Sequence, residues 1–269
     1  MSTLTFKNIT VRREGKTIVD DASLELASGE VHLIMGPNGS GKSTLLNAVM
    51  GHPAYEMTGG SFVLDDEDIT NLPTEKKAGK GVFLSMQYLP AVDGVTMLTL
   101  LHRAYRMIKG GLPAKFSSVE ESVGSKNTRK FLSGESSAGD ISIPEFYKML
   151  SAKVKEFNFD EGLLKRFVNK GFSGGEKKQG EMIQLLALEP KFALLDEIDS
   201  GVDIDSLVNV FAGIEKLRKE GTGFLIVTHL GTILEKINPD RVSVMKEGRV
   251  VKTGGPELAR EIIEKGFNG

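Results

Sequence analysis

The chain of 269 residues contains no cysteine. It therefore forms no disulfide and offers no thiolate to a metal ion or an iron–sulfur cluster, although the missing cysteine does not by itself fix a cellular compartment. A surplus of charge is missing as well, because 34 lysines and arginines face 36 aspartates and glutamates, for a formal net charge of -2. No overall basic field is present to hold nucleic acid, so we do not expect nucleic acid as the main partner.

Long apolar runs are also absent. A membrane-spanning helix needs about 18 consecutive apolar residues, and no stretch of this sequence reaches that length. The first residues, MSTLTFKNITVRREGK, lack the apolar core of a secretory signal. We therefore predict a cytoplasmic protein that does not insert into the membrane. The composition, 40% hydrophobic and 26% charged, is typical of a globular chain with a large core in one or two domains.

The segment GPNGSGKS fits the pattern G-x-x-x-x-G-K-[ST] at every fixed position. It follows the strand-like run EVHLIM and precedes the helix-like run STLLNAVM, so strand, glycine loop and helix come in the order that a phosphate-binding loop requires. The N–H groups of such a loop point at phosphate, Lys42 would reach the β and γ phosphates, and the Ser43 hydroxyl would ligate Mg²⁺. The predicted nucleotide contacts are Gly36, Pro37, Asn38, Gly39, Ser40, Gly41, Lys42, Ser43 and Thr44.

The segment FALLDEIDS, residues 192–200, is an apolar run that ends in acids. A buried parallel strand would deliver Asp196 and Glu197 at its carboxyl end, where ligands bind in open α/β sheets. We predict that Asp196 holds Mg²⁺ through water and that Glu197 polarises the attacking water as a general base. The alternative is that Glu197 caps the next helix or joins a surface ion pair.

A further core strand is predicted for GFLIVTH, which ends at His229. A histidine that directly follows a strand in a P-loop protein could sense the γ-phosphate. A histidine at the end of a strand is also often structural, and the residues alone leave both interpretations open.

Two serine–glycine segments compete for a second phosphate contact. In GFSGGEKKQGE, Ser173, Gly174 and Gly175 precede a helix-like run that stops before Pro190, so the backbone and the helix start would form an anion site. In FLSGESSAGD only one glycine follows the serine, and a polar run comes next. We interpret that second match as chance and predict a mobile surface loop over residues 115–140.

These motifs resemble the ATP-binding-cassette (ABC) ATPases over nearly the whole chain, with the P-loop, a glutamine in SMQYLP, FSGGE, the acidic strand, SGVD and the histidine in the family's order. The resemblance implies that the cofactors are ATP and Mg²⁺, and that Gln87 bridges Mg²⁺ and the partner-docking region. It implies that Asp203 lines a subunit contact, and that Ser173, Gly174 and Gly175 face ATP held by the other copy. We therefore expect an ATP-dependent homodimer.

Pattern and resemblance together predict an α/β fold, with a P-loop ABC ATPase core, an antiparallel β subdomain and a helical arm. Within a single domain over 1–269, residues 1–90 and 170–269 would form the nucleotide-binding core and residues 91–169 the arm. The core would begin with the antiparallel run LTFKNITVRREGKTIVDDASLEL, with GK at its turn, and end with the hairpin RVSVMKEGRVVKTG and the helix PELAREIIEKGF.

The early β region lacks the aromatic side chain that ABC ATPases commonly stack on adenine. Between Phe6 and the P-loop the only ring is that of His32, inside a predicted strand. We therefore expect Arg12, Arg13 or Val11 to cover the base, and we expect weak selectivity between ATP and GTP.

Within the family, the string LDEIDSGVDIDSL has no proline after the glutamate, unlike many import and export ATPases. With GPNGSGKSTL, YEMTGGSF and GFSGGEKK it looks closely similar to the SufC branch, the ATPases of the SUF iron–sulfur assembly machinery. That resemblance implies SUF scaffold proteins, of the SufB and SufD kind, as partners that would carry the cluster. It weakens over 110–142, and Gln179 stands where we would expect a basic residue.

Two other functions stay open. One is the ATPase subunit of a membrane transporter, bound to a separate transmembrane protein near Gln87. The other is a non-transport ATPase that acts on DNA or ribosomes, which would usually bring tandem cassettes or a long coiled coil, and this sequence has neither.

Overall fold

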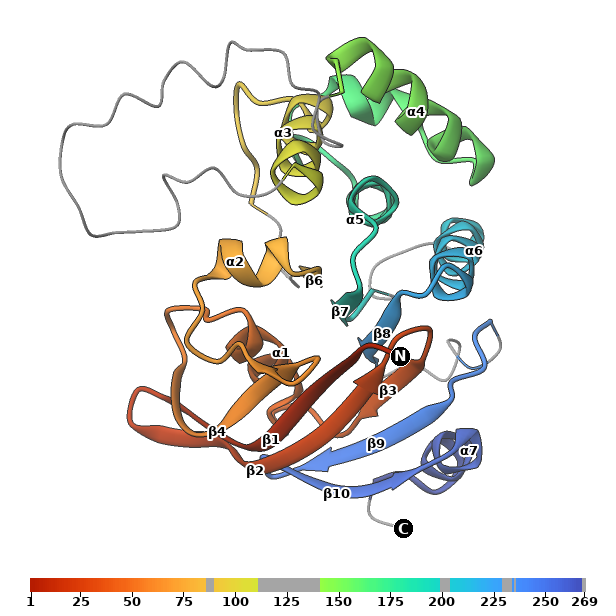
Figure 1. Ribbon diagram of the computed structural model, residues 1–269. Helices are drawn as coiled ribbons and strands as arrows, with labels where there is room; N and C mark the ends of the chain where they lie inside the picture. The colour runs from red at the N-terminus through yellow and green to blue at the C-terminus, as the bar shows by residue number, and fades with distance from the viewer. Residues whose placement is uncertain (86–89, 111–140, 199–203, 229–233, 235, 268–269) are drawn as a thin grey trace, which may run out of the picture.

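Two β-sheets organise the computed structural model, which describes residues 1–85, 90–110, 141–198, 204–228, 234 and 236–267 (Figure 1). Within these residues, one sheet is antiparallel with the strand order β2-β1-β4-β5, and the other has the order β10-β9-β3-β8-β7-β6. In the second sheet only β10 pairs antiparallel, at the edge. The strands are β1 (Thr3–Arg13), β2 (Lys16–Ala27), β3 (Val31–Met35), β4 (Glu56–Leu64), β5 (Glu67–Asp68), β6 (Val82–Ser85), β7 (Phe192–Asp196), β8 (Gly223–Val227), β9 (Arg241–Lys246) and β10 (Arg249–Gly254).

Helices cover both faces of the mainly parallel sheet. Figure 1 shows α3, α4 and α5 gathered on one side of it and α1 close to the antiparallel strands. This arrangement is the predicted α/β fold of an ABC ATPase, with an antiparallel β part and a helical region. The helices are α1 (Lys42–Val49), α2 (Thr74–Gly79), α3 (Met97–Lys109), α4 (Ile143–Glu156), the 3₁₀ turn η3 (Glu161–Lys165), α5 (Gly174–Leu188), α6 (Ile204–Lys219) and α7 (Pro256–Lys265).

The strands β3, β7 and β8 of the parallel sheet are buried on both faces because each divides its side chains between two cores. On β3, Leu33 belongs to the core shared with α3 to α7, and Ile34 belongs to the core shared with α1 and the antiparallel sheet. All five residues of β3, β7 and β8 are buried. This burial explains why EVHLIM, FALLD and GFLIV read as continuous apolar runs rather than alternating ones. The two faces together fix where β3 and β7 end, and therefore where the P-loop and the acidic pair begin.

Both hairpins turn on a glutamate–glycine pair. In the β1–β2 turn the residues with positive φ are Glu14 (50°) and Gly15 (77°), so the turn lies one residue before the predicted GK, and Lys16 already belongs to β2. The β9–β10 turn uses Glu247 and Gly248, with φ of 50° and 82°. Two central residues with positive φ match the right-handed twist of paired strands. The C-terminal hairpin and the closing helix α7 were predicted correctly.

Apolar residues at helical spacing on the arm form mostly buried faces. Phe146, Leu150 and Val154 of α4 and Met97 and Leu101 of α3 all lie in the core. They pack around α5, so the helix that follows the FSGGE segment is held by the arm as well as by the sheet.

The division into residues 1–90 with 170–269, and 91–169, stays a prediction. The segment 91–169 contains α3, α4 and η3 within the described residues. The loop predicted over 115–140 and the second serine–glycine segment lie outside them.

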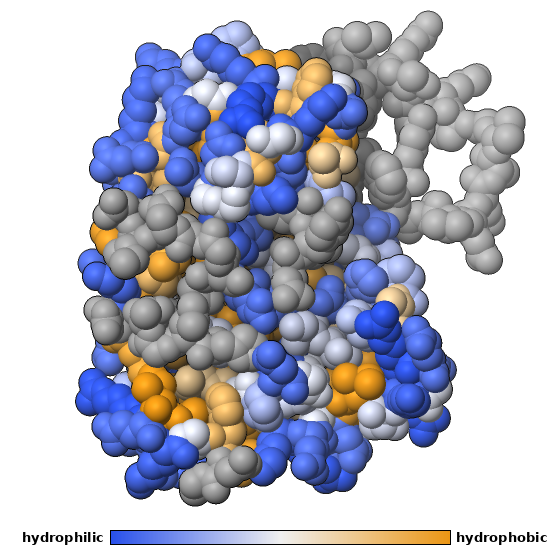
Figure 2. Space-filling model, turned by 180° about the vertical axis from the view of Figure 1, so that it is seen from behind, coloured by the Kyte–Doolittle hydropathy of each residue, from blue (hydrophilic) through white to orange (hydrophobic). Residues whose placement is uncertain are grey.

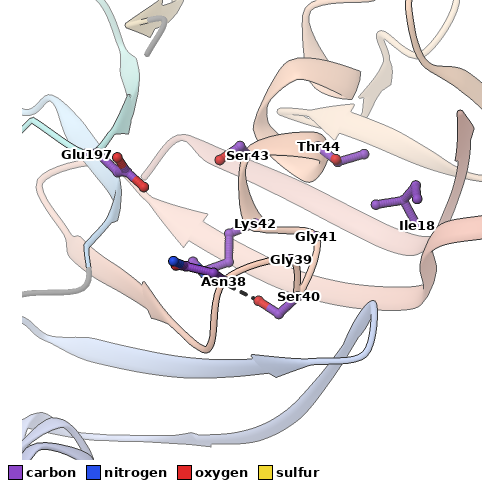
Figure 3. A pocket seen from close by; sticks show the side chains of 9 residues that line it. All are labelled: Ile18, Asn38, Gly39, Ser40, Gly41, Lys42, Ser43, Thr44 and Glu197. Carbon is purple, nitrogen blue, oxygen red and sulfur yellow. Dashed lines mark hydrogen bonds between the residues drawn. The ribbon is translucent and has the colours of Figure 1, made fainter.

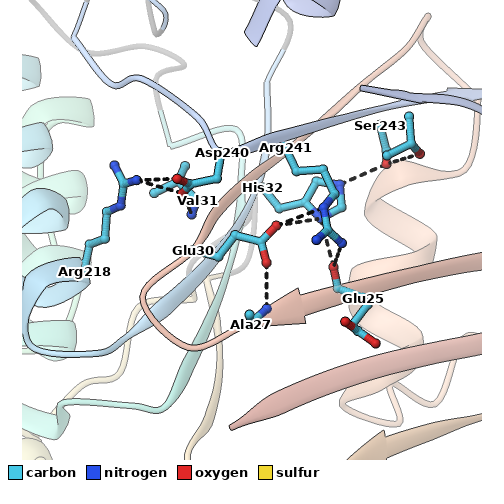
Figure 4. A network of polar contacts seen from close by, with 10 residues as sticks. Glu25, Ala27, Glu30, Val31, His32, Arg218, Asp240, Arg241 and Ser243 are labelled. Carbon is cyan, nitrogen blue, oxygen red and sulfur yellow. Dashed lines mark hydrogen bonds and ion pairs between the residues drawn. The ribbon is translucent and has the colours of Figure 1, made fainter. Parts of the chain in front are cut away.

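A buried polar network joins the two sheets at the start of β3 (Figure 4). The Nδ1 atom of His32 donates to the Glu25 carbonyl of β2 at 3.1 Å, and its Nε2 atom meets the Ser243 hydroxyl of β9 at 2.9 Å. Beside it, Arg241 pairs with Glu30 at 3.2 Å. Burial lowers the pKa of His32 to about 4, so the ring is neutral at physiological pH and Nε2 accepts from the serine. The strand that leads into the P-loop is thus anchored by an uncharged histidine.

None of the described helices is both long and apolar enough to cross a membrane. On the face seen in Figure 2, apolar side chains lie in small groups among hydrophilic ones. Scattered groups of this kind are ordinary for a protein surface.

Candidate nucleotide-binding site

The P-loop connects β3 to α1 and wraps around the side chain of Lys42, which is only 4% exposed. Its Nζ atom donates to the carbonyls of Gly36 at 2.8 Å and Pro37 at 2.9 Å. Burial lowers the pKa of Lys42, and the nearby carboxylates of Glu197 and Asp196 act in the opposite direction. The ammonium group is therefore held inside the loop, where a bound phosphate would pair with its positive charge.

Two P-loop glycines are required by sterics. Gly36 has φ of 157°, and a Cβ there would lie 2.0 Å from the Met245 carbonyl of β9. Gly41 has φ of 101°, and a Cβ there would lie 2.9 Å from the Ile18 carbonyl of β2. Both contacts are with backbone, which cannot move aside as a flexible side chain can. The glycines of the motif thus let the loop pass between the two sheets.

Ser43 and Asp196 meet at the carboxyl ends of the sheet. The Ser43 hydroxyl donates to Asp196 Oδ1 at 3.0 Å across 153 positions of sequence. Asp196 is 1% exposed, and its other oxygen, Oδ2, is buried without a hydrogen-bond partner. Burial raises the pKa of Asp196, and the bond from Ser43 lowers it. A buried carboxylate oxygen that lacks a partner beside a serine hydroxyl is a suitable place for a hard cation.

Glu197 follows β7 in a left-handed conformation, with φ of 52°, and its N–H donates to the Val227 carbonyl of β8 at 3.0 Å. Residues other than glycine and asparagine rarely adopt a positive φ. The hydrogen bond to the neighbouring strand therefore helps to hold Glu197 in this conformation. A turn residue, Ile198, follows Glu197, and α6 lies further along the chain at Ile204–Lys219, so Glu197 is not its cap. The capping part of the sequence alternative is wrong, whereas its ion-pair part stays a prediction.

The P-loop and Glu197 line one open cavity of about 410 Å³. Figure 3 shows Glu197 at one end of the row of P-loop side chains and Ile18 at the other. Ile18 is a lining residue that the sequence interpretation missed, because nothing in the run KTIVDD distinguishes it from a core strand residue. The lining residues are Ile18, Asn38, Gly39, Ser40, Gly41, Lys42, Ser43, Thr44 and Glu197.

Three predicted site residues, Gln87, Asp203 and His229, lie outside the described residues. One predicted base contact is wrong: Val11 is fully buried in the core between the sheets and cannot cover a base. The other two, Arg12 and Arg13, are not among the residues that line the cavity.

The FSGGE segment forms the N-terminus of α5. Ser173 is the N-cap, with Glu176 completing a capping box in which the Glu176 N–H donates to Ser173 Oγ at 3.2 Å and the Ser173 N–H donates to Glu176 Oε2 at 2.7 Å. By their position, the N–H groups of Gly174 and Gly175 have no acceptor within the helix. Ser173 and Gly174 are exposed, and neither lines the P-loop cavity. The chain thus carries two candidate anion sites, and Ser173, Gly174 and Gly175 are not among the residues that line the P-loop cavity.

A buried hydrogen bond connects α5 to the sheet near this site. Glu181, 1% exposed, accepts a short hydrogen bond from Ser85, the last residue of β6, and pairs with Lys178 at 2.9 Å. Lys178 also lowers the pKa of Asp196 slightly, against the larger effect of burial. Ser85 stands two residues before Gln87 in the sequence, so the helix that follows Ser173 is joined to the strand that leads to Gln87.

Comparisons with known proteins agree with this geometry. A family model described as "ABC transporter" matches residues 19–200. Vegetative protein 296 of Bacillus subtilis (strain 168) is 42% identical over 267 residues, which cover 99% of this chain and 92% of that protein.

Solved structures of ATP-binding cassettes share the fold. A nucleotide-free ATP-binding cassette from an ABC transporter superposes with a TM-score of 0.72 at 24% identity, over 98% of this chain and 96% of that one. A bacterial ABC transporter cassette, MJ0796, solved as a dimer, superposes with a TM-score of 0.69 at 19% identity, over 94% of this chain and 98% of that one.

Proposed function

We propose, from the premise that this chain belongs to the ABC ATPase family, that it hydrolyses ATP within a homodimer and uses the resulting movement to drive iron–sulfur cluster assembly on a SUF-type scaffold. The ATP-binding cassette and its ATPase class follow from the family. The residue roles, Mg²⁺, the dimer and the scaffold are the proposal. The observation that carries it is the cavity in which Lys42, Ser43 and Glu197 converge.

The P-loop would bind the phosphates through its N–H groups and through Lys42. Nζ would exchange its bonds to the Gly36 and Pro37 carbonyls for the β and γ phosphates. Because Lys42 is already buried in a rigid loop, little side-chain entropy would be lost when the phosphates arrive.

Mg²⁺ fits the donors beside the cavity. Among the described residues, no cluster of three or more histidines, aspartates or glutamates could hold a metal ion by itself. Mg²⁺ does not need such a cluster, because it keeps several waters and commonly binds one or two carboxylates plus substrate phosphates. The Ser43 hydroxyl and the orphaned Asp196 Oδ2 would hold it, with Gln87 as the third contact implied by the resemblance. When bound, it would neutralise charge that develops on the β and γ phosphates.

Glu197 would act as the general base. It lines the cavity directly beyond the strand end that carries Asp196, so its carboxylate can accept a proton from a water placed against the γ-phosphate. His229 would sense the γ-phosphate from the strand that neighbours β7.

The second anion site supports the homodimer. Ser173, Gly174 and Gly175 lie outside the P-loop cavity of their own chain, and a two-fold dimer would bring them to the ATP of the other copy, with Asp203 at the contact. The Ser173 hydroxyl accepts from the Glu176 N–H and keeps its own hydrogen to donate to a phosphate oxygen. ATP would thus join the two chains because it binds the closed pair better than the open one.

The SUF assignment rests on the sequence string LDEIDSGVDIDSL, with GPNGSGKSTL and GFSGGEKK. We propose that the scaffold pair docks on the helical arm, at exposed apolar residues that follow Gln87 in sequence or lie on α3 and before α5. Val92, Leu100 and Phe167 are apolar and 40%, 38% and 40% exposed. Val92 and Phe167 sit on neighbouring stretches, because the Val92 N–H donates to the Val168 carbonyl. Scaffold binding here would place two chains near one another before ATP closes them.

The transporter alternative is favoured by the matched family's description, "ABC transporter". Purification of the chain with its native partners separates the two. Soluble scaffold proteins are expected, and capture of only an integral membrane protein would replace the SUF proposal with the transporter one.

A second experiment tests the link between ATP and assembly. The scaffold should raise ATP turnover, because it brings the chains together. The Lys42→Ala variant should still bind scaffold but fail to support cluster assembly. Cluster assembly by Lys42→Ala at the normal rate would contradict the proposal.

A further inference from the structure

Glu176 places a carboxylate at the very helix end that would receive a phosphate. It is the third residue of α5, and its side chain folds back so that Oε2 accepts from the Ser173 N–H at 2.7 Å. That bond, followed by the effect of Arg166, lowers the pKa of Glu176, so the group is charged at neutral pH. A negative charge at a helix N-terminus stabilises the helix. The same charge repels a phosphate brought to that end.

Arg166 neutralises this carboxylate. Its Nη1 atom forms an ion pair with Glu176 Oε1, and its Nη2 atom donates to the Gly171 carbonyl at 3.1 Å. The guanidinium also lies over the Phe172 ring, 4.4 Å from its centroid. One side chain therefore contacts the two residues before Ser173 and the acid that follows it. Arginine suits this task because its planar fork donates in two directions while it stacks on a ring.

Two nearby lysines pair with other acids: Lys170 with Asp93 at 2.8 Å, and Lys178 with Glu181 at 2.9 Å. The ion pair of Glu176 is formed with Arg166.

The backbone of Arg166 is fixed from the opposite side. Its carbonyl accepts from the Met97 N–H at 3.0 Å, and the Val168 N–H donates to the Val95 carbonyl at 3.0 Å. These bonds, with a bridge between Thr96 and Phe167, form a short ladder between residues 92–97 and 166–168. The guanidinium thus starts from a backbone that is held independently of α5.

We propose that Arg166 is the positioning residue of the Ser173 site: it cancels the charge of Glu176 so that Ser173, Gly174 and Gly175 can receive the γ-phosphate of ATP bound by a second copy of this chain. The inference rests on the proposed function, because only the ATP-dependent dimer brings that phosphate to Ser173. Without Arg166, closure would press the phosphate against an uncompensated carboxylate.

The test is a double-mutant cycle on the full chain. Every protein carries Glu197→Gln to stop turnover, and the dissociation constant of the dimer is measured in Mg-ATP by sedimentation. The four proteins carry no further change, Arg166→Ala, Glu176→Gln, or both. Arg166→Lys serves as the conservative variant, and ATP binding by the monomer and the melting temperature are measured for each as controls for folding.

Arg166→Ala should weaken the dimer about tenfold at each of two equivalent sites, or on the order of a hundredfold in the dissociation constant. Adding Glu176→Gln should restore it to within about tenfold of the parent, because removing the carboxylate removes the need for the arginine. Arg166→Lys should retain most of the affinity. ATP binding by the monomer should not change, since the P-loop is intact.

The rescue distinguishes charge from structure. The double variant still lacks the hydrogen bond to Gly171 and the contact with the Phe172 ring. If the role of Arg166 were purely structural, Glu176→Gln would therefore not restore dimerisation. That result would overturn the inference while the dimer proposal stands. Unchanged dimerisation of Arg166→Ala would overturn it too. A parent protein that forms no dimer in ATP would overturn the proposed dimer and this inference together.

Discussion

The P-loop and the Ser173 segment each lie at the N-terminus of a helix, but the two regions are built differently. At the P-loop, Lys42 is 4% exposed, two glycines fit against backbone, and the acidic partners come from the same chain. At α5, the serine is exposed, an acid closes the capping box, and an arginine from outside the helix compensates it. The P-loop site contains the ammonium group of Lys42 and two nearby carboxylates. The Ser173 site exposes hydrogen-bond donors beside a carboxylate whose charge is compensated by Arg166.

This difference is consistent with the proposed homodimer. Lys42 and Glu197 line the P-loop cavity, and Ser173 lies outside its lining. A site that exposes serine and glycine N–H groups gains from a phosphate only when that phosphate is brought to it. We therefore interpret the P-loop site as the part that binds ATP and the Ser173 site as the part that reports it to the partner.

The change with the largest expected effect is Glu197→Gln. The amide keeps the shape of the cavity but cannot accept the proton, so ATP turnover should fall about a hundredfold or more while an ATP-bound dimer accumulates. Steady-state turnover and sedimentation in ATP measure both effects. Glu264→Gln, on an exposed position of α7, is the matched control. Near-normal turnover of Glu197→Gln would remove Glu197 from the role of base.

Acid should weaken the sheet that carries the P-loop site. The pKa of His32 is about 4 in the folded chain, against 6.5 for an ordinary histidine, so between these values the unfolded chain binds more protons and stability falls as the pH falls. From pH 7 to pH 5 the loss due to His32 should be about 2 kcal/mol. Urea unfolding at both pH values, compared between the wild type and His32→Gln, measures it. Equal pH dependence in the two proteins would show that His32 does not carry this effect.

The smallest expected effect concerns recognition of the adenine or guanine base of the nucleotide. Val11 is buried, Ile18 lies at the end of the cavity away from Glu197, and no aromatic residue of β1 or β2 is among the residues that line the cavity. GTP should compete within about tenfold of ATP, or roughly 1.4 kcal/mol, and Ile18→Ala should weaken both nucleotides alike. Competition binding checks this. A much larger preference for ATP would mean that another residue recognises the base.

Sequence patterns predicted the elements that carry chemistry because those elements are local. The P-loop, the strand ending at Asp196 and the helix after Ser173 each combine a hydrophobic run with glycine or an acid at a fixed offset. The first hairpin shows the limit of such patterns. Glu14 has a positive φ, although glutamate rarely adopts one, and the turn therefore lies one residue earlier than predicted.

The residues that were missed act through contacts between distant segments. Ile18 reaches the cavity because Gly41 packs against its carbonyl, and Arg166 reaches Glu176 because its backbone pairs with residue 97. Val11 was placed wrongly for the same reason, since only the second sheet makes it core. The hydrophobic periodicity of one strand or helix does not predict which other element packs against it.

The central claim, that each ATP is shared between two chains, has a direct test. Lys42→Ala disables the P-loop site, and Ser173→Asp keeps the N-cap while it places a negative charge where the γ-phosphate would bind. Each variant alone should be nearly inactive.

An equal mixture of the two variants should recover about a quarter of wild-type ATP turnover, because half of the random dimers are mixed and each mixed dimer has one intact site. Turnover of the mixture equal to the mean of the two separate variants would contradict the claim and place the whole site within one chain.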